Sequence, residues 1–600
     1  MLKRGKNSKI TNRKDIRENL LYVGWIILCV FSIFSIRMVS WVFHNWGNLR
    51  MDELIFTLTA SLEGTNPALI RGAIFYVLPW CLLVLVLAIV LLQAFRIKGW
   101  NRKRLLSVGA LLSSITIIGS LSYFGHRVGF IDYLQNQSGE SSFIEEHYID
   151  PAKVEMKFPE KKRNLIYIFV ESMEVSYADE KNGGGKEENL IPELTKIAKE
   201  NEDFSGESTK LNGASSLFGA TYTMGGLFAQ TSGLPLSVPP IELAESKGFL
   251  PGITVLGDVL EQQGYHNVFF IGTDASFGER GTYFQQHGNH DIFDFNTALE
   301  NQEIPYNYKR AFWGYDDYIL YENAKAHLLE LAQDDQPFNF TMLTVDTHAE
   351  DGYLCDICPH EHYDDPYADV FHCASQQAAD FIEWIQEQDF YEDTTIVVVG
   401  DHISMDSDFC DDIDSNYQRK NYSVYINAAQ SPKTKKRREL SSMDNFPTVL
   451  ASLGVDIKGD KLGLGVNAFS DTPTLLEVYG EKQLNKDLSK KSTFFKKVIG
   501  SKKKENKAKA TYDETTGYMT FSVPKPLRYS GENLRVYCDL NHKSLEEPIR
   551  IELYETKDEY RAIYSLSNLG YEKGKYEANF FVMFKDNLAN PYAEKKIIVK

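Results

Sequence analysis

Three polar residues that follow short apolar runs of the sequence could together hold a divalent metal ion. Glu171 comes directly after the apolar run at residues 165–170, and Asp401 and His402 come one residue after the run at 396–399. A single carboxylate after a strand is more often a helix cap or a surface residue. Two carboxylates and an imidazole, however, are a suitable ligand set for Mn²⁺, Mg²⁺ or Zn²⁺. The sequence therefore predicts a metal site at these residues.

A candidate nucleophile, Thr223, lies in the small-residue loop at residues 219–226, which a helix-like run at 227–231 follows. A hydroxyl at a helix N-terminus lies where the helix dipole favours an anion, and direct contact with a metal ion can deprotonate it. Thr221 is the alternative in the same loop, and a threonine at such a position could simply be an N-cap. Thr223 is therefore predicted as the nucleophile in combination with the metal site.

The elements that must position these residues alternate along the middle of the chain. The predicted strands are residues 165–170, 268–271, 340–345, 396–399 and 423–426, and the predicted helices are residues 193–200, 318–332 and 376–388. This alternation indicates an α/β domain with a mostly parallel sheet flanked by helices. Ligands of such sheets gather at the carboxyl ends of the strands, which is where Glu171, Asp401 and His402 are expected.

Three long apolar runs precede this domain, at residues 20–36, 73–95 and 105–124, and each has roughly the length of a bilayer span. Basic residues dominate the segment before the first run and the loop after the second, so both are predicted to be cytoplasmic. Three spans that start inside end outside. We therefore expect a multi-pass protein of the cell membrane with its catalytic domain on the extracytoplasmic side. Arg37, Met38 and Trp41 replace the small residues of a signal-peptide cleavage site, which favours an uncleaved anchor.

The composition divides the chain into five predicted parts. They are an anchor with three transmembrane helices (residues 1–130), a juxtamembrane linker (131–160), a catalytic domain (161–485), a lysine-rich linker (486–510) and a β domain (511–600). The last part has repeated alternating runs broken by turn residues. This pattern is typical of a small β-sandwich, and an immunoglobulin-like one is expected.

Charge and composition exclude several classes of protein. The 600 residues include 64 basic and 82 acidic side chains, and the net charge of −18 repels nucleic-acid phosphates. A hydrophobic content of 43% with 24% charged residues indicates folded domains, so the chain is not disordered. No nucleic-acid partner is expected. The basic run at residues 433–438 is interpreted as a solvated loop.

Four of the seven cysteines cluster in the sequence: Cys355, Cys358, Cys373 and Cys410. In an oxidising compartment such a cluster predicts one or two disulfides, whose pairing the sequence does not determine. The alternative is a zinc site, because Cys355 and Cys358 form a C-x-x-C motif. A second C-x-x-C that would complete a four-sulfur site is missing from the sequence, so disulfides are preferred.

Four segments in this order resemble the phosphoglycerol transferase and lipoteichoic acid synthase family, which belongs to the sulfatase and alkaline phosphatase-like superfamily. They are residues 164–174 (NLIYIFVESME), 223–236 (TMGGLFAQTSGLPL), 399–402 (VGDH) and 442–451 (SMDNFPTVLA). The resemblance covers about residues 160 to 470 and extends to the three-span anchor, but not to the β domain. It implies an alkaline phosphatase/sulfatase-like fold for the catalytic domain.

The resemblance also implies roles for individual residues. Those that match the family's metal site, which usually holds Mn²⁺, are Glu171, Thr223, Asp401 and His402. Thr223 also matches the nucleophile that carries the glycerophosphate. Arg280 matches an arginine that grips the phosphate, and His348 matches a histidine on the substrate side. A planar guanidinium can hold a phosphoryl group bidentately, and a near-neutral histidine can serve the leaving or entering oxygen.

The function that the resemblance implies is transfer of glycerol phosphate through a covalent glycerophospho-threonine. The expected donor is phosphatidylglycerol, and the expected acceptor is a cell-surface glycan or a teichoic-type polymer. Lipoteichoic acid synthases carry an aromatic residue two positions before the phosphate arginine, where this chain has Gly278. The segments around Leu234 and His348 are more similar to the phosphoglycerol transferase I branch, whose acceptors are glycans. A surface polysaccharide is therefore the preferred acceptor.

Three other functions compete with this hypothesis. A phosphoethanolamine transferase shares the fold and the threonine nucleophile but takes a different head group. A sulfatase needs a Cys or Ser followed by x-Pro-x-Arg for conversion to formylglycine, and the segment after Thr223 lacks this motif. A non-catalytic, glycan-binding membrane protein is the alternative from a different class. The presence of all four metal-site residues favours catalysis.

Overall fold

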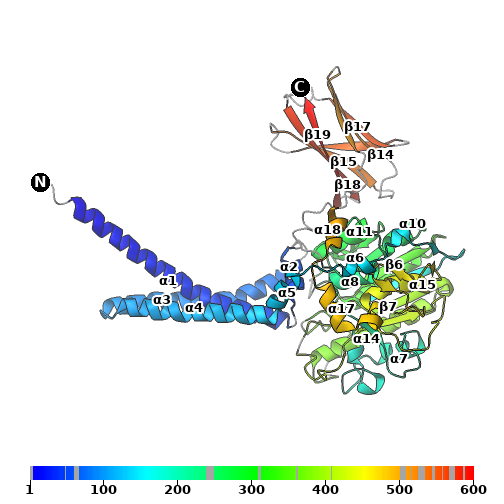
Figure 1. Cartoon of the computed structure of the whole chain (residues 1–600), viewed down its shortest axis with the longest axis horizontal. Helices are drawn as coiled ribbons and strands as arrows, with labels where there is room; N and C mark the ends of the chain where they lie inside the picture. The colour runs from blue at the N-terminus through cyan, green and yellow to red at the C-terminus, as the bar shows by residue number, and fades with distance from the viewer. Residues whose placement is uncertain are drawn as a thin grey trace.

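The computed structural model describes the backbone of residues 5–47, 49–59, 67–237, 249–308, 313–349, 351–359, 362–406, 408–500, 508–514, 516–524, 534–543, 548–556, 559–565, 574–584 and 588–599. Long helices form the N-terminal part, an α/β domain follows, and the C-terminal part consists of strands (Figure 1). This is the order of parts that the sequence predicts.

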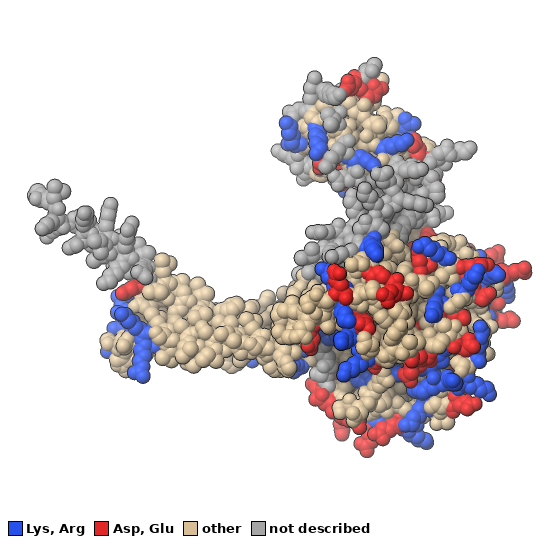
Figure 2. Space-filling model, viewed as in Figure 1, with Lys and Arg blue, Asp and Glu red and all other residues tan. Residues whose placement is uncertain are grey.

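The N-terminal helices form a rod in which α1 (Gly5–Asn45) packs against α3 (Pro67–Ile97) and α4 (Arg102–Arg127) (Figure 1). Three segments in these helices are long and apolar enough to cross a membrane: Glu18–Asn45, Ile70–Ile97 and Arg102–Arg127. They contain the three predicted spans. Between its ends, the face of the rod shown in Figure 2 carries almost only uncharged side chains, as lipid-facing helices do.

The α/β domain contains an eight-stranded sheet with the order β5-β4-β6-β2-β7-β8-β3-β9. The strands are β5 (Asp291–Phe293), β4 (His266–Ile271), β6 (Phe338–Leu343), β2 (Asn164–Val170), β7 (Thr394–Gly400), β8 (Asn421–Ile426), β3 (Gly213–Ser215) and β9 (Leu440–Ser441). The first five run parallel to one another, and only β8 is antiparallel to its two neighbours. The prediction of a mostly parallel sheet is confirmed.

Helices cover both faces of this sheet, and β2 shows why. Its side chains alternate between two hydrophobic cores, with Leu165, Tyr167 and Phe169 in one core and the residues between them in the other. The first core includes α8 (Thr223–Ser232), α10 (Leu256–Gln262), α11 (Arg280–Gln286) and α15 (Asn445–Ser452). The second core includes α7 (Pro192–Glu200), α13 (Asp317–Leu331) and α14 (Pro366–Gln386). Because β2 is buried on both faces, its sequence is an almost continuous run of apolar residues.

Short elements outside residues 161–485 also pack on the α/β domain. Phe143 of α6 (Phe143–His147) and Phe494 of α18 (Thr493–Gly500) are buried in the first core. Strand β1 (Met156–Lys157) pairs with β10 (Asp456–Ile457). Parts of both predicted linkers therefore pack on the domain. Charged and polar residues around Phe143 and Phe494 face solvent, so the composition of these segments does not reveal the short contacts.

The C-terminal strands form one antiparallel sheet with the order β13-β14-β17-β16-β15-β18-β19. They are β13 (Lys509–Asp513), β14 (Tyr518–Pro524), β17 (Glu559–Ser565), β16 (Ile549–Glu555), β15 (Leu534–Asn541), β18 (Gly574–Phe584) and β19 (Leu588–Val599). The two edge strands, β13 and β19, also contact each other, so the sheet is nearly closed around a single core. The expected β domain is present, but its strands are continuous through β16 and β17 instead of forming two separate stacked sheets.

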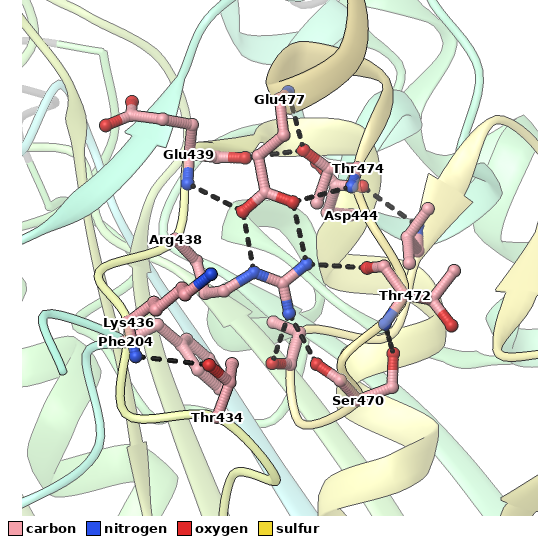
Figure 3. A network of polar contacts seen from close by, with 12 residues as sticks. Phe204, Thr434, Lys436, Arg438, Glu439, Asp444, Ser470, Thr472, Thr474 and Glu477 are labelled. Atoms are coloured by element: carbon pink, nitrogen blue, oxygen red, sulfur yellow. Dashed lines mark hydrogen bonds and ion pairs between the residues drawn. The ribbon is translucent and has the colours of Figure 1, made fainter.

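The basic run at residues 433–438 is not wholly solvated, because Arg438 is buried. Its Nε and Nη2 donate hydrogen bonds to the two carboxylate oxygens of Glu477, at 2.7 and 3.1 Å (Figure 3). Its remaining N–H groups donate to the carbonyl oxygens of Ala468, Ser470 and Thr472. All five donors of the guanidinium are therefore paired, and Arg438 fixes residues 468–477 next to β9.

Candidate functional site

Five of the six predicted site residues, all except Thr223, follow the carboxyl ends of four adjacent parallel strands, β4, β6, β2 and β7. Val170, the last residue of β2, is the register partner of Gly400, the last residue of β7. The residues that follow, Glu171 and Asp401, are therefore neighbours. The segments after β6 and β4, on the other side of β2, carry His348 and Arg280. Strand order and register thus bring together side chains that are far apart in the sequence. The first and last of them, Glu171 and His402, are 231 positions apart.

The turn after β2 is strained and links the two strand ends. Ser172 has φ of +53°, a left-handed conformation that costs a non-glycine residue about 1–3 kcal/mol. Its N–H donates a hydrogen bond to Oδ1 of Asp401, at 2.8 Å. The N–H of His402 donates to the same oxygen, also at 2.8 Å. These two hydrogen bonds hold the Asp401 carboxylate with its second oxygen, Oδ2, directed to the site.

Three buried side chains converge in this place. His402 Nε2 is 3.2 Å from Glu171 Oε1 and 3.4 Å from Asp401 Oδ2. Glu171, Asp401 and His402 each offer one ligand atom, and these atoms lie within 4.8 Å of one another. Thr223 Oγ1 is 3.5 Å from Glu171 Oε2 and 3.4 Å from His402 Nε2. The four residues predicted as the metal site therefore form one cluster.

The cluster fits a divalent ion. Within the described part of the chain, Oδ2 of Asp401 is buried and accepts no hydrogen bond. A buried carboxyl oxygen that accepts no hydrogen bond is costly, and buried charges normally either form pairs or coordinate metals. The Nδ1 atom of His402 lies 2.7 Å from the carbonyl oxygen of Ile403, to which it can donate a hydrogen bond, leaving Nε2 as the ligand atom.

Thr223 is the first residue of α8, whose N-terminus lies against the cluster. The helix can approach because Gly226 has no side chain: a Cβ there would lie 2.1 Å from the carbonyl oxygen of Asp401. Gln230 of the same helix donates hydrogen bonds to the carbonyl oxygens of Gly400 and Asp401. The competing Thr221 is buried, and its Oγ1 has no hydrogen-bond partner among the described residues. The geometry therefore favours Thr223 over Thr221.

The side chains of the cluster strongly perturb each other's pKa. Burial alone would raise the pKa of Glu171, but the hydrogen bond and charge of His402 outweigh it and lower the pKa to about 2. Burial alone would lower the pKa of His402, but Asp401 and Glu171 raise it to about 10. The pKa of Asp401 is raised by its burial and by the charge of Glu171. Without a metal ion, the imidazole therefore carries a positive charge at neutral pH.

Metal binding is expected to release protons from this cluster. Metal-free His402 stays protonated below its pKa of about 10, whereas a metal ligand must be neutral. Binding of Mn²⁺ at neutral pH should therefore release about one proton or more per ion, and the affinity should increase as pH rises. Calorimetric titrations in buffers of different ionisation enthalpy measure this proton count. An affinity that is constant between about pH 6 and 9 would contradict the prediction.

Arg280 and His348 also face the cluster. Burial lowers the pKa of Arg280 to about 10, although the negative charges of Glu171 and Asp274 act to raise it. The guanidinium therefore remains charged at neutral pH. Its Nε donates to the carbonyl oxygen of Phe277, and neither Nη1 nor Nη2 makes a hydrogen bond to another described residue. Burial lowers the pKa of His348, which favours the neutral imidazole. Two terminal nitrogens on a buried cation can bind an anionic group.

Sequence reasoning missed two contributions to the site. Trp313 lies against the ring of His348, with ring centroids 4.7 Å apart and the ring planes tilted by 39°. Helix α2 (Met51–Thr59), between the first two spans, packs Phe56 against Tyr222, with ring centroids 5.3 Å apart. Burial raises the pKa of Glu53, on the same helix, to about 8, although the positive charge of His402 acts to lower it. The acidic and apolar alternation of α2 is its only local signal, and nothing in it indicates the partner.

Known proteins resemble this chain along its sequence. Residues 163–455 match the family model described as Sulfatase. Phosphoglycerol transferase I of Salmonella choleraesuis (strain SC-B67) is 29% identical over 471 residues, which cover 76% of this chain and 57% of the relative. The same enzyme of Shigella flexneri is 29% identical over 460 residues, covering 74% and 56%. The chain thus spans little more than half the length of these curated relatives.

Solved structures were also found. The lipoteichoic acid synthase LtaP from Listeria monocytogenes has a TM-score of 0.42 and 16% identity, with 55% of this chain and 81% of that chain covered. The lipooligosaccharide phosphoethanolamine transferase EptA from Neisseria meningitidis has a TM-score of 0.39 and 12% identity, with 72% and 84% covered. Residues 163–455 thus have a sulfatase-like α/β fold, with the eight-stranded sheet described above at its centre.

Proposed function

We propose that the protein is a membrane-anchored phosphotransferase that moves glycerol phosphate from phosphatidylglycerol to a cell-surface glycan or teichoic-type polymer. The observation that carries this proposal is the position of the Thr223 hydroxyl, which lies at the N-terminus of α8 and 3.4 Å from His402 Nε2. The name of the curated relatives supports glycerol phosphate as the transferred group. A threonine at this position argues against sulfate-ester hydrolysis through formylglycine.

The proposed reaction has two displacements at phosphorus. Thr223 loses its hydroxyl proton and attacks the phosphodiester; the bond between Oγ1 and phosphorus forms as the bond to the diacylglycerol oxygen breaks. Diacylglycerol leaves after gaining a proton, and Thr223 holds a glycerophosphate ester. A hydroxyl of the acceptor then attacks the same phosphorus, and Oγ1 of Thr223 leaves and regains a proton. Atoms and charge balance without a further reactant.

Glu171, Asp401 and His402, with Thr223, would hold the metal ion, for which we propose Mn²⁺ over Mg²⁺ or Zn²⁺. When bound, such an ion supplies Lewis-acid chemistry: it lowers the pKa of a coordinated hydroxyl and neutralises charge on phosphoryl oxygens. The N-terminus of α8 contributes a further positive potential, because its first N–H groups lack partners within the helix. The hydrogen bonds from Ser172 and His402 to Asp401 keep the ligands oriented before substrate arrives.

Arg280 and His348 are proposed to act on the substrate side. The terminal nitrogens of Arg280 would bind the non-bridging oxygens of the phosphodiester. His348, which lies against Trp313, would take the proton of the entering acceptor hydroxyl in the second displacement. Its lowered pKa suits this role, because the imidazole is neutral before the acceptor arrives.

The helical rod supports an extracytoplasmic position for the catalytic domain. α4 ends at Arg127 and leads directly into that domain, whereas basic residues gather at the opposite end of the rod (Figure 2). The basic residues near the turn between α3 and α4 are Arg96, Lys98, Arg102, Lys103 and Arg104. Such residues stay on the cytoplasmic side, so the other end of the rod lies outside. The anchor then keeps the site near its lipid donor, which raises the effective concentration.

The deciding experiment uses the full-length protein in lipid vesicles that contain Mn²⁺ and either phosphatidylglycerol or phosphatidylethanolamine, without acceptor. Intact mass and peptide mapping then show which group Thr223 carries. We expect a glycerophosphate adduct with phosphatidylglycerol and none after metal removal. A phosphoethanolamine adduct would replace the proposed donor. Absence of any adduct and of diacylglycerol release, in protein that binds Mn²⁺, would overturn catalysis in favour of a binding function.

Arg280→Lys is expected to slow diacylglycerol release by about 10²–10³-fold, the typical effect of losing one donor to a developing oxyanion. A lysine keeps the charge but cannot present two parallel N–H groups. The measurement is the initial rate at saturating phosphatidylglycerol, with Mn²⁺ binding as the control for an intact metal cluster. A rate within a few-fold of the unchanged protein would remove Arg280 from the phosphate-binding role.

A further inference from the structure

A second group of potential metal ligands lies outside the site described above. Cys355, Cys358 and Cys373 are all buried, and their sulfur atoms lie within 4.8 Å of one another. Sγ of Cys355 and Sγ of Cys358 are 3.3 Å apart. In a tetrahedral zinc–thiolate site, Zn–S bonds of about 2.3 Å place two sulfurs about 3.8 Å apart. The three sulfurs are therefore arranged closely enough to bind one ion.

The structure does not contain the disulfides that the sequence predicts, since all seven cysteines are unbonded. Cys410, the fourth member of the sequence cluster, packs instead against the core formed by α7, α13 and α14. A disulfide among Cys355, Cys358 and Cys373 would use two sulfurs and leave a third thiol buried beside it. A single ion would use all three.

Gln377, one turn after Cys373 on α14, provides an independent observation. It is 9% exposed, and its Nε2 donates to Sγ of Cys373 at 3.1 Å and to Sγ of Cys355 at 3.8 Å. Its Oε1 is buried and has no hydrogen-bond partner among the described residues. Amide groups that donate hydrogen bonds to metal-bound thiolates are typical of such sites. The amide of Gln377 donates to sulfurs from two separate segments, and its own oxygen is the atom without a partner among the described residues.

The surroundings are also acidic. Asp316, Asp317 and Asp346 lie close enough to Cys355 for their charges to interact with it. Asp317 and Asp346 accept hydrogen bonds from each other's backbone N–H groups, at 2.9 and 3.0 Å, so their carboxyls are fixed in place. Three thiolates could be buried in this acidic environment only with a compensating positive charge, which a bound divalent ion would supply.

We propose that Cys355, Cys358 and Cys373 form a structural site for a thiophilic divalent ion, Zn²⁺, that is separate from the cluster of Glu171, Asp401 and His402. The two sites differ in chemistry, because the first offers three soft sulfur ligands and the second offers oxygen and nitrogen. Gln377, which contacts two of the three sulfurs, would adjoin the bound ion.

The site would tie one wall of the active site to α14. The segment from Thr344 to Cys358 begins at the metal cluster, where Thr347 Oγ1 donates to the carbonyl oxygen of Glu171, at 2.6 Å. Tyr367 of α14 donates to the carbonyl oxygen of Thr347, at 2.8 Å. The zinc ion would attach the other end of this segment, at Cys355 and Cys358, to Cys373 of the same helix. His348 would then lie between two points at which the segment is held to α14.

The test uses the full-length protein in detergent, purified without reductant or chelator and then loaded with Co²⁺. Bound Co²⁺ absorbs in the near ultraviolet through thiolate charge transfer only where sulfur ligands are present. We expect this band, its loss in Cys373→Ser, and its retention in two controls. Cys410→Ser removes a cysteine outside the cluster, and Glu171→Gln damages only the oxygen and nitrogen site.

A second measurement on the unmutated protein keeps the proposal falsifiable if Cys373→Ser does not fold. The purified protein is analysed for zinc, denatured with a chelator and alkylated before peptide mapping. We expect about one zinc per chain that survives in Glu171→Gln, and alkylation of all three cysteines. A disulfide-linked peptide joining any two of Cys355, Cys358 and Cys373, or absence of the cobalt–thiolate band, would overturn the proposal. Neither result would bear on Thr223 and its transfer chemistry.

Discussion

Thr223→Ala is expected to abolish the glycerophosphate adduct and to slow diacylglycerol release by roughly four orders of magnitude or more, as loss of a nucleophile does in other covalent enzymes. The substitution removes the hydroxyl that lies within 3.5 Å of both Glu171 and His402. The rate is measured with phosphatidylglycerol vesicles and Mn²⁺, and Mn²⁺ binding is measured in parallel. Binding should weaken only modestly, since three ligands remain.

Thr221→Ala is the matched control for this prediction. Thr221 lies two residues earlier in the same loop, is buried, and makes no hydrogen bond through Oγ1 to another described residue. Its substitution should leave both the adduct and the rate within a few-fold. Thr223→Ser, which keeps a hydroxyl, should retain the adduct. Normal turnover in Thr223→Ala, or an adduct that maps to Thr221, would show that the nucleophile is misassigned.

Arg438→Met is expected to lower the free energy of unfolding of the α/β domain by about 3–5 kcal/mol. The substitution leaves the Glu477 carboxylate without its bidentate partner and removes the donors to three carbonyl oxygens (Figure 3). Glu477 is itself exposed, so most of this cost comes from the carbonyl oxygens that lose their donors, at about 1–3 kcal/mol for each buried acceptor left unpaired. Urea unfolding followed by tryptophan fluorescence measures the effect.

The neighbouring arginine provides the comparison. Arg437 donates to the carbonyl oxygens of Lys210 and Leu211 but is exposed to solvent. Arg437→Met should therefore cost no more than about 1 kcal/mol, as exposed polar contacts generally do. Equal effects of the two substitutions would show that the buried network of Arg438 does not stabilise the domain beyond an ordinary surface contact.

The arrangement of the metal cluster follows from local sequence features. Buried parallel strands are continuous apolar runs, so the ends of β2 and β7 are visible as Glu171 and Asp401 in the sequence. The register that makes Val170 and Gly400 partners was not needed for this prediction, because parallel strands in one sheet share an edge. Arg280 and His348 were assigned from the resemblance alone, since their segments carry no periodic signal.

Other features depend on contacts between distant segments and could not be predicted. Gly226 looks like any glycine in a small-residue loop, although its missing side chain is what admits α8 to the carbonyl of Asp401. Arg438 belongs to a basic run, and only the fold of residues 468–477 turns it into a buried residue. The pairing of Phe56 with Tyr222 joins residues 166 positions apart in different parts of the chain. Periodicity describes one element at a time and contains no information of this kind.

The packing of Phe56 on Tyr222 has a practical consequence for protein production. A shortened, soluble version that starts after the membrane helices would lack α2 and would expose the ring beside Thr223 to water. Exposed aromatic surface promotes self-association. Such a fragment should aggregate more readily than its overall charge suggests, and grafting residues 51–59 back onto it through a flexible tether should restore solubility. Crystallisation and inhibitor screening would then start from that tethered form.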